Sequence, residues 1–224
     1  MEPYRTDEEQ IDALKGWWQE NGKSTVLGIL AALALFFGWQ GWQTQQANRV
    51  AEASAMYQSL LEADTAAESG AAQLATAKHL AETLKSQFPS MTYAVFAAMY
   101  KAKYAARDDD WQTAESELQW VISQKPDAPI LLQAKVRLAH VLLAQKRYED
   151  AQKTLEGSDL GSYAALIAET RGDILFAQGK SDEALAAYQQ AQAQLAKLEN
   201  ASQNPILDMK IRDLTPASSG ADSE

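Results

Sequence analysis

The chain has 224 residues and no cysteine, which excludes disulfide bonds, thiolate nucleophiles and cysteine-ligated metal sites. Its formal net charge is −10, so its surface repels phosphate backbones and we do not expect nucleic acid as a partner. Apolar residues make up 46% of the chain, which is enough for a folded core of ordinary size.

Residues 1–23 form a polar leader with six acidic and three basic side chains. We predict a short amphipathic helix over residues 6–20, because Thr6 and Glu9 form a capping box. Asn21-Gly22 is its expected stop. The apolar side of this helix carries Ile11, Leu14 and Trp18. This side fits the membrane interface or a protein contact, and a positioning segment without a partner is the third interpretation.

Residues 24–42 read STVLGILAALALFFGWQGW and contain no charged side chain. Their number is close to the roughly 20 residues that a helix needs to cross a bilayer. Trp39 and Trp42 at one end and Lys23 at the other are typical of residues at the two membrane–water interfaces. The sequence therefore predicts a single transmembrane anchor in contact with membrane lipid.

Two alternatives to a membrane anchor are a cleaved signal peptide and a buried helix of a soluble protein. A signal peptide is disfavoured by the long acidic segment in front, by the absence of a small-residue cleavage pattern and by the two tryptophans behind. A buried soluble helix is disfavoured because residues 26–37 have no polar face.

The basic residues around the anchor predict its orientation, because positive charge is retained in the cytoplasm. Arg5, Lys15 and Lys23 precede the anchor, whereas Arg49 alone follows it closely. We therefore expect a single-pass inner-membrane protein with a cytoplasmic N-terminus and a periplasmic domain over residues 43–214. Two pairs of small residues in the anchor would permit close contact with another membrane span. They are Gly28 with Ala32 and Ala34 with Gly38.

The periplasmic part is expected to be entirely α-helical and to contain internal repeats. Three stretches share an alanine followed, four positions on, by a larger apolar residue. The alanines are Ala114, Ala151 and Ala184, spaced by 37 and 33 residues, and a weaker copy begins 37 residues earlier at Ala77. Such a period is typical of stacked helix pairs in which the small residue lies where two helices approach closely.

This pattern resembles the tetratricopeptide repeat. In the best copy the small and aromatic positions of that repeat are occupied by Gly172, Ala184, Tyr188 and Ala191. The other copies have Ala102 or Ala139 at the glycine position, and Pro126 stands at the terminal proline position of the middle copy. The resemblance implies an α-solenoid fold. It also gives Gly172 a packing role, although Arg171-Gly172-Asp173 matches a cell-adhesion motif in isolation.

The search for catalytic chemistry finds no convergent set of residues. His79 and His140 are not spaced like a pair of metal ligands in the sequence. Asp108-Asp109-Asp110 fits a helix start better than a Ca²⁺-binding loop. We therefore expect neither enzymatic activity nor a cofactor.

The repeat resemblance implies instead a concave partner-binding groove lined by the first helix of each pair. In this register its residues are Phe96, Met99, Lys103, Gln133, Val136, His140, Leu166, Glu169, Asp173 and Phe176. For each of them, packing of the repeats is the alternative role.

The whole layout resembles the YfgM family of single-span ancillary subunits of the SecYEG translocon. The matching motifs, in order, are Glu20-Asn21-Gly22-Lys23, Gly38-Trp39, Val136-Arg137-Leu138-Ala139, Leu175 after Arg171-Gly172-Asp173, and Met209-Lys210-Ile211. The resemblance implies association with the translocon, with periplasmic chaperones and with newly exported polypeptides. The alternative function is a scaffold for another envelope complex, such as a division or outer-membrane assembly complex. Residues 215–224 are expected to form a disordered tail because they lack large apolar residues.

Overall fold

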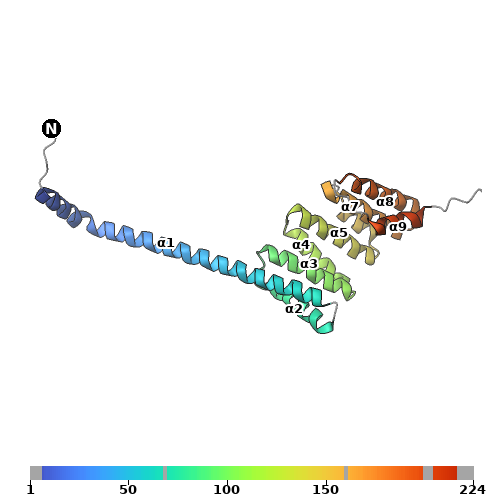
Figure 1. The fold of residues 1–224 in the computed structure, drawn as a ribbon, viewed down its shortest axis with the longest axis horizontal. Coiled ribbons are helices and arrows are strands. Elements are labelled where there is room, and N and C mark those ends of the chain that lie inside the picture. Colours follow the sequence, from blue (N-terminus) through green and yellow to red (C-terminus); the bar gives the residue numbers. More distant parts are fainter. Residues whose placement is uncertain (1–6, 68–69, 159–160, 199–203, 216–224) are drawn as a thin grey trace, which may run out of the picture. The chain divides into compact units, whose positions relative to one another are not determined.

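The computed structural model describes residues 7–67, 70–158, 161–198 and 204–215 of the chain. All secondary structure in these ranges is helical, as the sequence predicted (Figure 1). The α-helices are α1 Asp7–Ala66, α2 Ala71–Gln87, α3 Thr92–Arg107, α4 Trp111–Ser123, α5 Ala128–Ala144, α6 Tyr148–Thr154, α7 Ala164–Ala177, α8 Ser181–Leu195 and α9 Pro205–Leu214, and a 3₁₀ turn η1 spans Gly161–Tyr163.

The chain divides into two compact units, and the long helix α1 contributes to both. In the described part of the chain, the first unit consists of α1 as far as Ala55. The second unit begins at Met56 and contains the last turns of α1 together with helices α2 to α9. The repeats predicted from the sequence therefore all lie in the second unit.

The expected helix stop at Asn21-Gly22 is wrong, because α1 continues through both residues. The Asn21 side chain donates to the Trp17 carbonyl at 3.2 Å, and the Thr25 hydroxyl donates to the Asn21 carbonyl at 3.0 Å. These bonds reach back four residues within the same helix, so the asparagine does not compete with the helical backbone. The expected cap at Thr6 lies outside the described residues.

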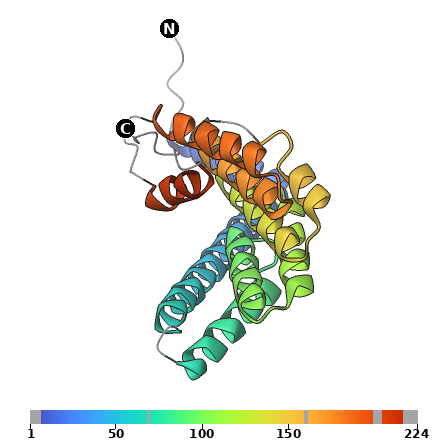
Figure 2. The same ribbon diagram turned by 90° about the vertical axis from the view of Figure 1, so that its right-hand side faces the viewer.

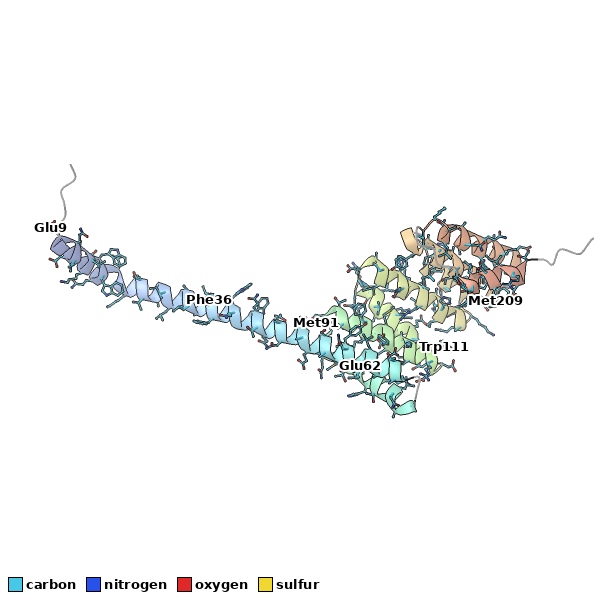
Figure 3. All side chains as sticks on the ribbon, viewed as in Figure 1. Glu9, Phe36, Glu62, Met91, Trp111 and Met209 are labelled. Atoms are coloured by element: carbon cyan, nitrogen blue, oxygen red, sulfur yellow. The ribbon has the colours of Figure 1, made fainter. Side chains whose placement is uncertain are left out.

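The apolar stretch of α1 exposes every large apolar side chain from Val26 to Trp42, including Phe36 (Figure 3). In water, leaving such a side chain exposed forfeits roughly 1.5–3 kcal/mol. The stretch therefore requires an apolar environment. Its exposure disfavours the buried soluble helix, and α1 is long and apolar enough to cross a membrane.

Three helix pairs follow one another in the second unit, namely α3 with α4, α5 with α6, and α7 with α8 (Figure 2). The second helix of each pair buries the predicted alanine and the apolar residue four positions on. These residues, each at most 2% exposed, are Ala114 and Leu118, Ala151 and Leu155, and Ala184 and Tyr188. Helix α2 is the weaker first copy, in which Ala77 is also buried, and it packs against α3.

The turn between the two helices of each pair has the same backbone geometry in all three pairs. The residue two positions before the second helix is left-handed, with φ of 60° at Asp109, 60° at Lys146 and 77° at Gly179. The next N–H donates to a carbonyl five residues back, which is the bond of a Schellman motif. These bonds run from Asp110 to Ala105, from Arg147 to Leu142 and from Lys180 to Leu175.

Helix α4 begins as the sequence predicted, with Asp110 as its cap. The Asp110 carboxylate accepts a hydrogen bond from the Thr113 N–H at 3.1 Å. Bonds from Thr113 lower the pKa of Asp110, because they favour its charged form. Asp108 instead pairs with Lys78, and Asp109 occupies the left-handed turn position. The three aspartates therefore have three separate structural roles.

A buried carboxylate on α4 joins three helices. Glu117 is only 7% exposed and accepts from Lys85 on α2 at 2.5 Å and from Lys101 on α3 at 2.6 Å. The Lys85 ammonium also lies over the Trp120 ring, 4.3 Å from its centroid. Although burial opposes it, hydrogen bonding to Glu117 and Glu82 raises the pKa of Lys101. Lys101 is therefore held in the charged form beside Glu117.

Candidate protein-binding surface

The predicted groove residues occupy the first helices of the three pairs. Phe96, Met99 and Lys103 lie on α3, Gln133, Val136 and His140 on α5, and Leu166, Glu169, Asp173 and Phe176 on α7. The structure gives these residues different environments. Some are buried between the repeats, some are covered by the two ends of the domain, and some are exposed.

Two of the predicted groove residues belong to the core. Met99 and Val136 are each 6% exposed and lie in one apolar cluster with residues such as Leu118 and Leu138. Their side chains therefore hold adjacent pairs together, which is the alternative role that the sequence left open. A partner at the surface would not reach them without displacing the repeats.

The last turns of α1 cover the predicted residues of α3. The Tyr57 ring stacks on Phe96, with centroids 5.4 Å apart. The Asp64 carboxylate accepts from the Lys103 ammonium at 2.7 Å and from the Tyr104 hydroxyl at 2.9 Å. Burial and the nearby Asp64 raise the pKa of Tyr104, so its hydroxyl remains a donor. Phe96 and Lys103 are thus engaged within the domain.

Helix α9 covers the predicted acidic residues of α7, an arrangement that the sequence analysis missed. The Lys210 ammonium lies 2.9 Å from Glu169 and 2.7 Å from Asp173. Asp173 also accepts from the Tyr188 hydroxyl at 2.8 Å. On its apolar side α9 buries Leu207 in a cluster with Tyr188. The apolar spacing of Leu207, Ile211 and Leu214 was a signal for a packed amphipathic helix.

The exposed members of the set are spread over α5 and α7. Gln133 and His140 on α5 are exposed, as are Leu166 and Phe176 on α7. Phe176 is 55% exposed and borders a pocket of about 330 Å³ that Lys210 and Leu214 also line. Although His140 is exposed as a whole residue, desolvation of its imidazole lowers the pKa of His140, and the nearby Asp173 and Glu169 oppose this effect. Its imidazole is therefore neutral at neutral pH.

A cleft of about 450 Å³ opens beside His140, between α3 and α5. Helix α4 packs against both of these helices and contributes Trp111 and Leu118 to the cleft. The remaining lining residues are Ala102, Lys103, Ala106, Arg137, His140, Val141 and Ala144. The cleft therefore has an apolar lining with basic side chains among its residues.

We expect Lys210→Met to weaken the docking of α9, because Glu169 and Asp173 would lose their shared cation. Although burial opposes it, hydrogen bonding to Asp173 and Glu169 raises the pKa of Lys210. Burial and the hydrogen bond to Asp173 raise the pKa of Tyr188. Because the fold favours both protonated forms, their stabilisation is complete below about pH 10 and is lost at higher pH.

The measurement is the melting temperature of the wild type and of Lys210→Met between pH 8 and pH 12, with Lys153→Met on α6 as the control. The melting temperature of the wild type should fall above about pH 10. That of Lys210→Met should be lower at pH 8 and should fall less as the pH rises. An unchanged alkaline loss in Lys210→Met would contradict a role of this lysine in holding α9.

The predicted small-residue pairs of the anchor, Gly28 with Ala32 and Ala34 with Gly38, lie in the first unit. Gly28 and Gly38 have open space around them in α1, so a neighbouring span could approach these pairs. That contact stays a prediction. In the part of the chain that the structure describes, no three His, Asp or Glu side chains are placed to bind one metal ion.

Stacked helix pairs in one unit and an apolar helix of membrane-spanning length in the other are typical of a membrane-associated protein of the helical-repeat, protein-binding class. The tetratricopeptide repeat-like domain family matches residues 15–216 of the chain. The ancillary SecYEG translocon subunit of Haemophilus influenzae is 31% identical over 208 residues, covering 93% of this chain and 97% of the relative. The chain therefore belongs to the family of ancillary SecYEG translocon subunits, as its resemblance to the YfgM family predicted.

Two more relatives have the same name and match over their full length. The ancillary SecYEG translocon subunit of Neisseria gonorrhoeae is 31% identical and that of Escherichia coli 26% identical. Each comparison covers 96% of this chain and 100% of the relative. The similarity thus extends over the apolar helix as well as the repeats.

Proposed function

We propose that this protein associates with the Sec translocon and assists the export or folding of newly translocated proteins together with periplasmic chaperones. The observation that carries the proposal is the match to three ancillary SecYEG translocon subunits along nearly the whole chain. The helical-repeat fold supports it, because such domains bind other polypeptides. The role is one of binding, without catalysis.

In this proposal the chain crosses the inner membrane once, with residues 1–23 in the cytoplasm and residues 24–42 as the anchor. The repeats lie in the periplasm, and the basic residues ahead of the anchor support this orientation. The small-residue pairs around Gly28 and Gly38 are candidates for contact with a translocon span. We place the start of the periplasmic domain at residue 43, directly after the anchor, although the second compact unit of the structure begins at Met56.

Tethering explains how weak contacts suffice for such a role. A domain fixed beside the exit of the translocon meets each emerging chain at an effective concentration in the millimolar range, to order of magnitude. The exposed residues Gln133, His140 and Phe176 offer mixed polar and apolar contacts without deep burial. Such contacts release a client rapidly, which suits transient assistance during export.

We expect photocrosslinkers at Gln133, His140 and Phe176, placed one at a time in living cells, to capture translocon subunits, periplasmic chaperones and many exported proteins. Mass spectrometry of the captured species is the measurement. A crosslinker at the exposed Ala186 on α8 is the matched control, because α8 is a second helix of its pair and lies outside the groove register.

Three outcomes would contradict the proposal. One constant stoichiometric partner would identify a scaffold of another envelope complex. Capture of cytoplasmic proteins alone would show that the orientation is wrong. Equal capture from Ala186 and from the three groove positions would show that the first helices are not the binding surface.

A further inference from the structure

We propose that the cleft between α3 and α5, here called the α3–α5 cleft, anchors a partner segment that presents a large apolar side chain next to a carboxylate. The inference rests on the proposed function and specifies the chemistry of the segment that is bound. It is supported by the shape of the cleft, by its charge and by the way α9 packs on the last helix pair, α7 with α8.

The shape of the α3–α5 cleft results from small side chains. Ala102 and Ala106 on α3 lie across from Ala144 on α5, so that the wall residues fill little of the space. Leu118 and Val141, which are 1% and 6% exposed, provide an apolar base. A volume of about 450 Å³ lies within the usual range of ligand sites and exceeds the size of one leucine or phenylalanine side chain.

The binding free energy of such an apolar pocket is most favourable for a side chain whose whole surface becomes buried in it. Removing a leucine or phenylalanine side chain from water stabilises by roughly 1.5–3 kcal/mol. The Trp111 ring, which is half-buried, gives one side of the cleft a flat aromatic face. The cleft therefore selects for size and apolarity, and polar or small side chains would leave it partly empty.

The charge at the α3–α5 cleft comes from Arg137 and Lys103. Lys103 is already held by Asp64 at 2.7 Å, so its charge is largely compensated. Arg137 is exposed, and in the described ranges its charge acts on Tyr100, but no carboxylate forms an ion pair with it. In a chain of net charge −10, an uncompensated guanidinium beside an apolar pocket favours a carboxylate on the partner.

Helix α9 shows how the neighbouring part of the same surface binds a segment. It combines a buried apolar residue, Leu207, with one charged residue, Lys210, that meets two side chains of opposite sign on α7. The α3–α5 cleft has the same two elements with the charge reversed. A segment that binds there should therefore combine an apolar anchor with an acidic group.

The described ends of the domain do not fill this cleft, because Tyr57 of α1 stacks on Phe96, Asp64 of α1 meets only Lys103 at the edge of the cleft, and α9 packs on the last helix pair. Residues 216–224 contain two carboxylates but no large apolar side chain. The segment is thus expected to come from another polypeptide, which is the role that the proposed function assigns to the domain.

The test uses the full-length protein in detergent micelles and three fluorescent eight-residue peptides. The first carries Leu-Phe flanked by aspartates, the second Leu-Phe flanked by lysines, and the third Ala-Ala flanked by aspartates. Fluorescence anisotropy gives the Kd of each peptide. We expect the first peptide to bind about tenfold more tightly than either of the others, which corresponds to one charge contact or one apolar anchor.

Two variants connect this preference to the cleft. Ala106→Trp fills the pocket and should weaken the first peptide at least about tenfold. Arg137→Glu lies on the surface, leaves the fold intact and should reverse the preference between the aspartate and lysine peptides. The matched controls are Ala186→Trp on α8 and Lys153→Glu on α6, both at exposed positions, and they should bind like the wild type.

Equal affinity for the three peptides in the wild type would overturn the inference. Unchanged binding by both Ala106→Trp and Arg137→Glu would overturn it as well. The proposed function is judged separately by the crosslinking in cells. If the peptides bound without preference but the cells still showed capture of exported proteins, the inference about the cleft alone would be refuted. If the peptide preference held but no exported protein were captured, the proposed function alone would be refuted.

Discussion

Replacing Gly172 by valine is expected to destabilise the last helix pair. Any Cβ at this position of α7 would lie within 3.0 Å of three atoms of the Tyr188 ring. That ring cannot move away easily, because it is 2% exposed and its hydroxyl is bonded to Asp173. We expect a loss of about 3 kcal/mol in the free energy of unfolding and a fall of roughly 10 °C in the melting temperature.

The control is Ala177→Val in the same helix, at an exposed position where only the lower helix propensity of valine acts. Thermal and urea unfolding followed by circular dichroism would measure both variants. Combining Gly172→Val with Tyr188→Ala should cost less than the sum of the two changes, because the small side chain removes the overlap. Additive losses would show that the close approach of the helices is not the cause.

Replacing Glu117 by alanine is expected to cost about 3 kcal/mol, because breaking a buried ion pair leaves the partner charge uncompensated. In this protein two ammonium groups, those of Lys85 and Lys101, would lose the same carboxylate. The damage should fall on the contacts of α4 with α2 and α3. Hydrogen exchange of the backbone amides would locate it, and chemical unfolding would give its size.

The matched control is Glu82→Ala, which removes the exposed partner of Lys101 and should cost no more than about 1 kcal/mol. A triple variant with methionine at positions 85, 101 and 117 should recover most of the stability lost in Glu117→Ala, because it removes the charges together. If the triple variant were less stable than Glu117→Ala, the cost would come from packing, and the ionic explanation would be wrong.

The helical repeats could be predicted because their signal is local and periodic. Ala114, Ala151 and Ala184 recur at nearly constant intervals, and each is completely buried in the second helix of a pair. Gly172 and Tyr188 could be assigned to packing for the same reason, since the repeat pattern places them opposite each other. In such a fold each residue has most of its contacts within its own or the adjacent repeat.

The sequence pattern could not predict that α1 and α9 cover parts of the predicted groove. Lys210 meets Glu169 from 41 residues further along the chain, and Lys103 meets Asp64 across 39 residues. Both contacts join a repeat to a helix outside the repeat pattern, so the period carries no information about them. Asn21-Gly22 was misjudged for a different reason, since a local stop signal is weak and α1 runs on through both residues into the apolar stretch.

The ion pairs of Lys210 imply that the two ends of the last helix pair respond differently to the solvent. Toward α6 this pair is held by buried apolar residues such as Ile167 and Ile174, whose contacts are insensitive to ionic strength. Toward α9 the apolar contact of Leu207 is joined by the largely buried ion pairs of Lys210 with Glu169 and Asp173. Salt screens such pairs only weakly, but loss of the Lys210 charge at high pH would release the terminal helix before the central array, so that unfolding would begin at one defined end.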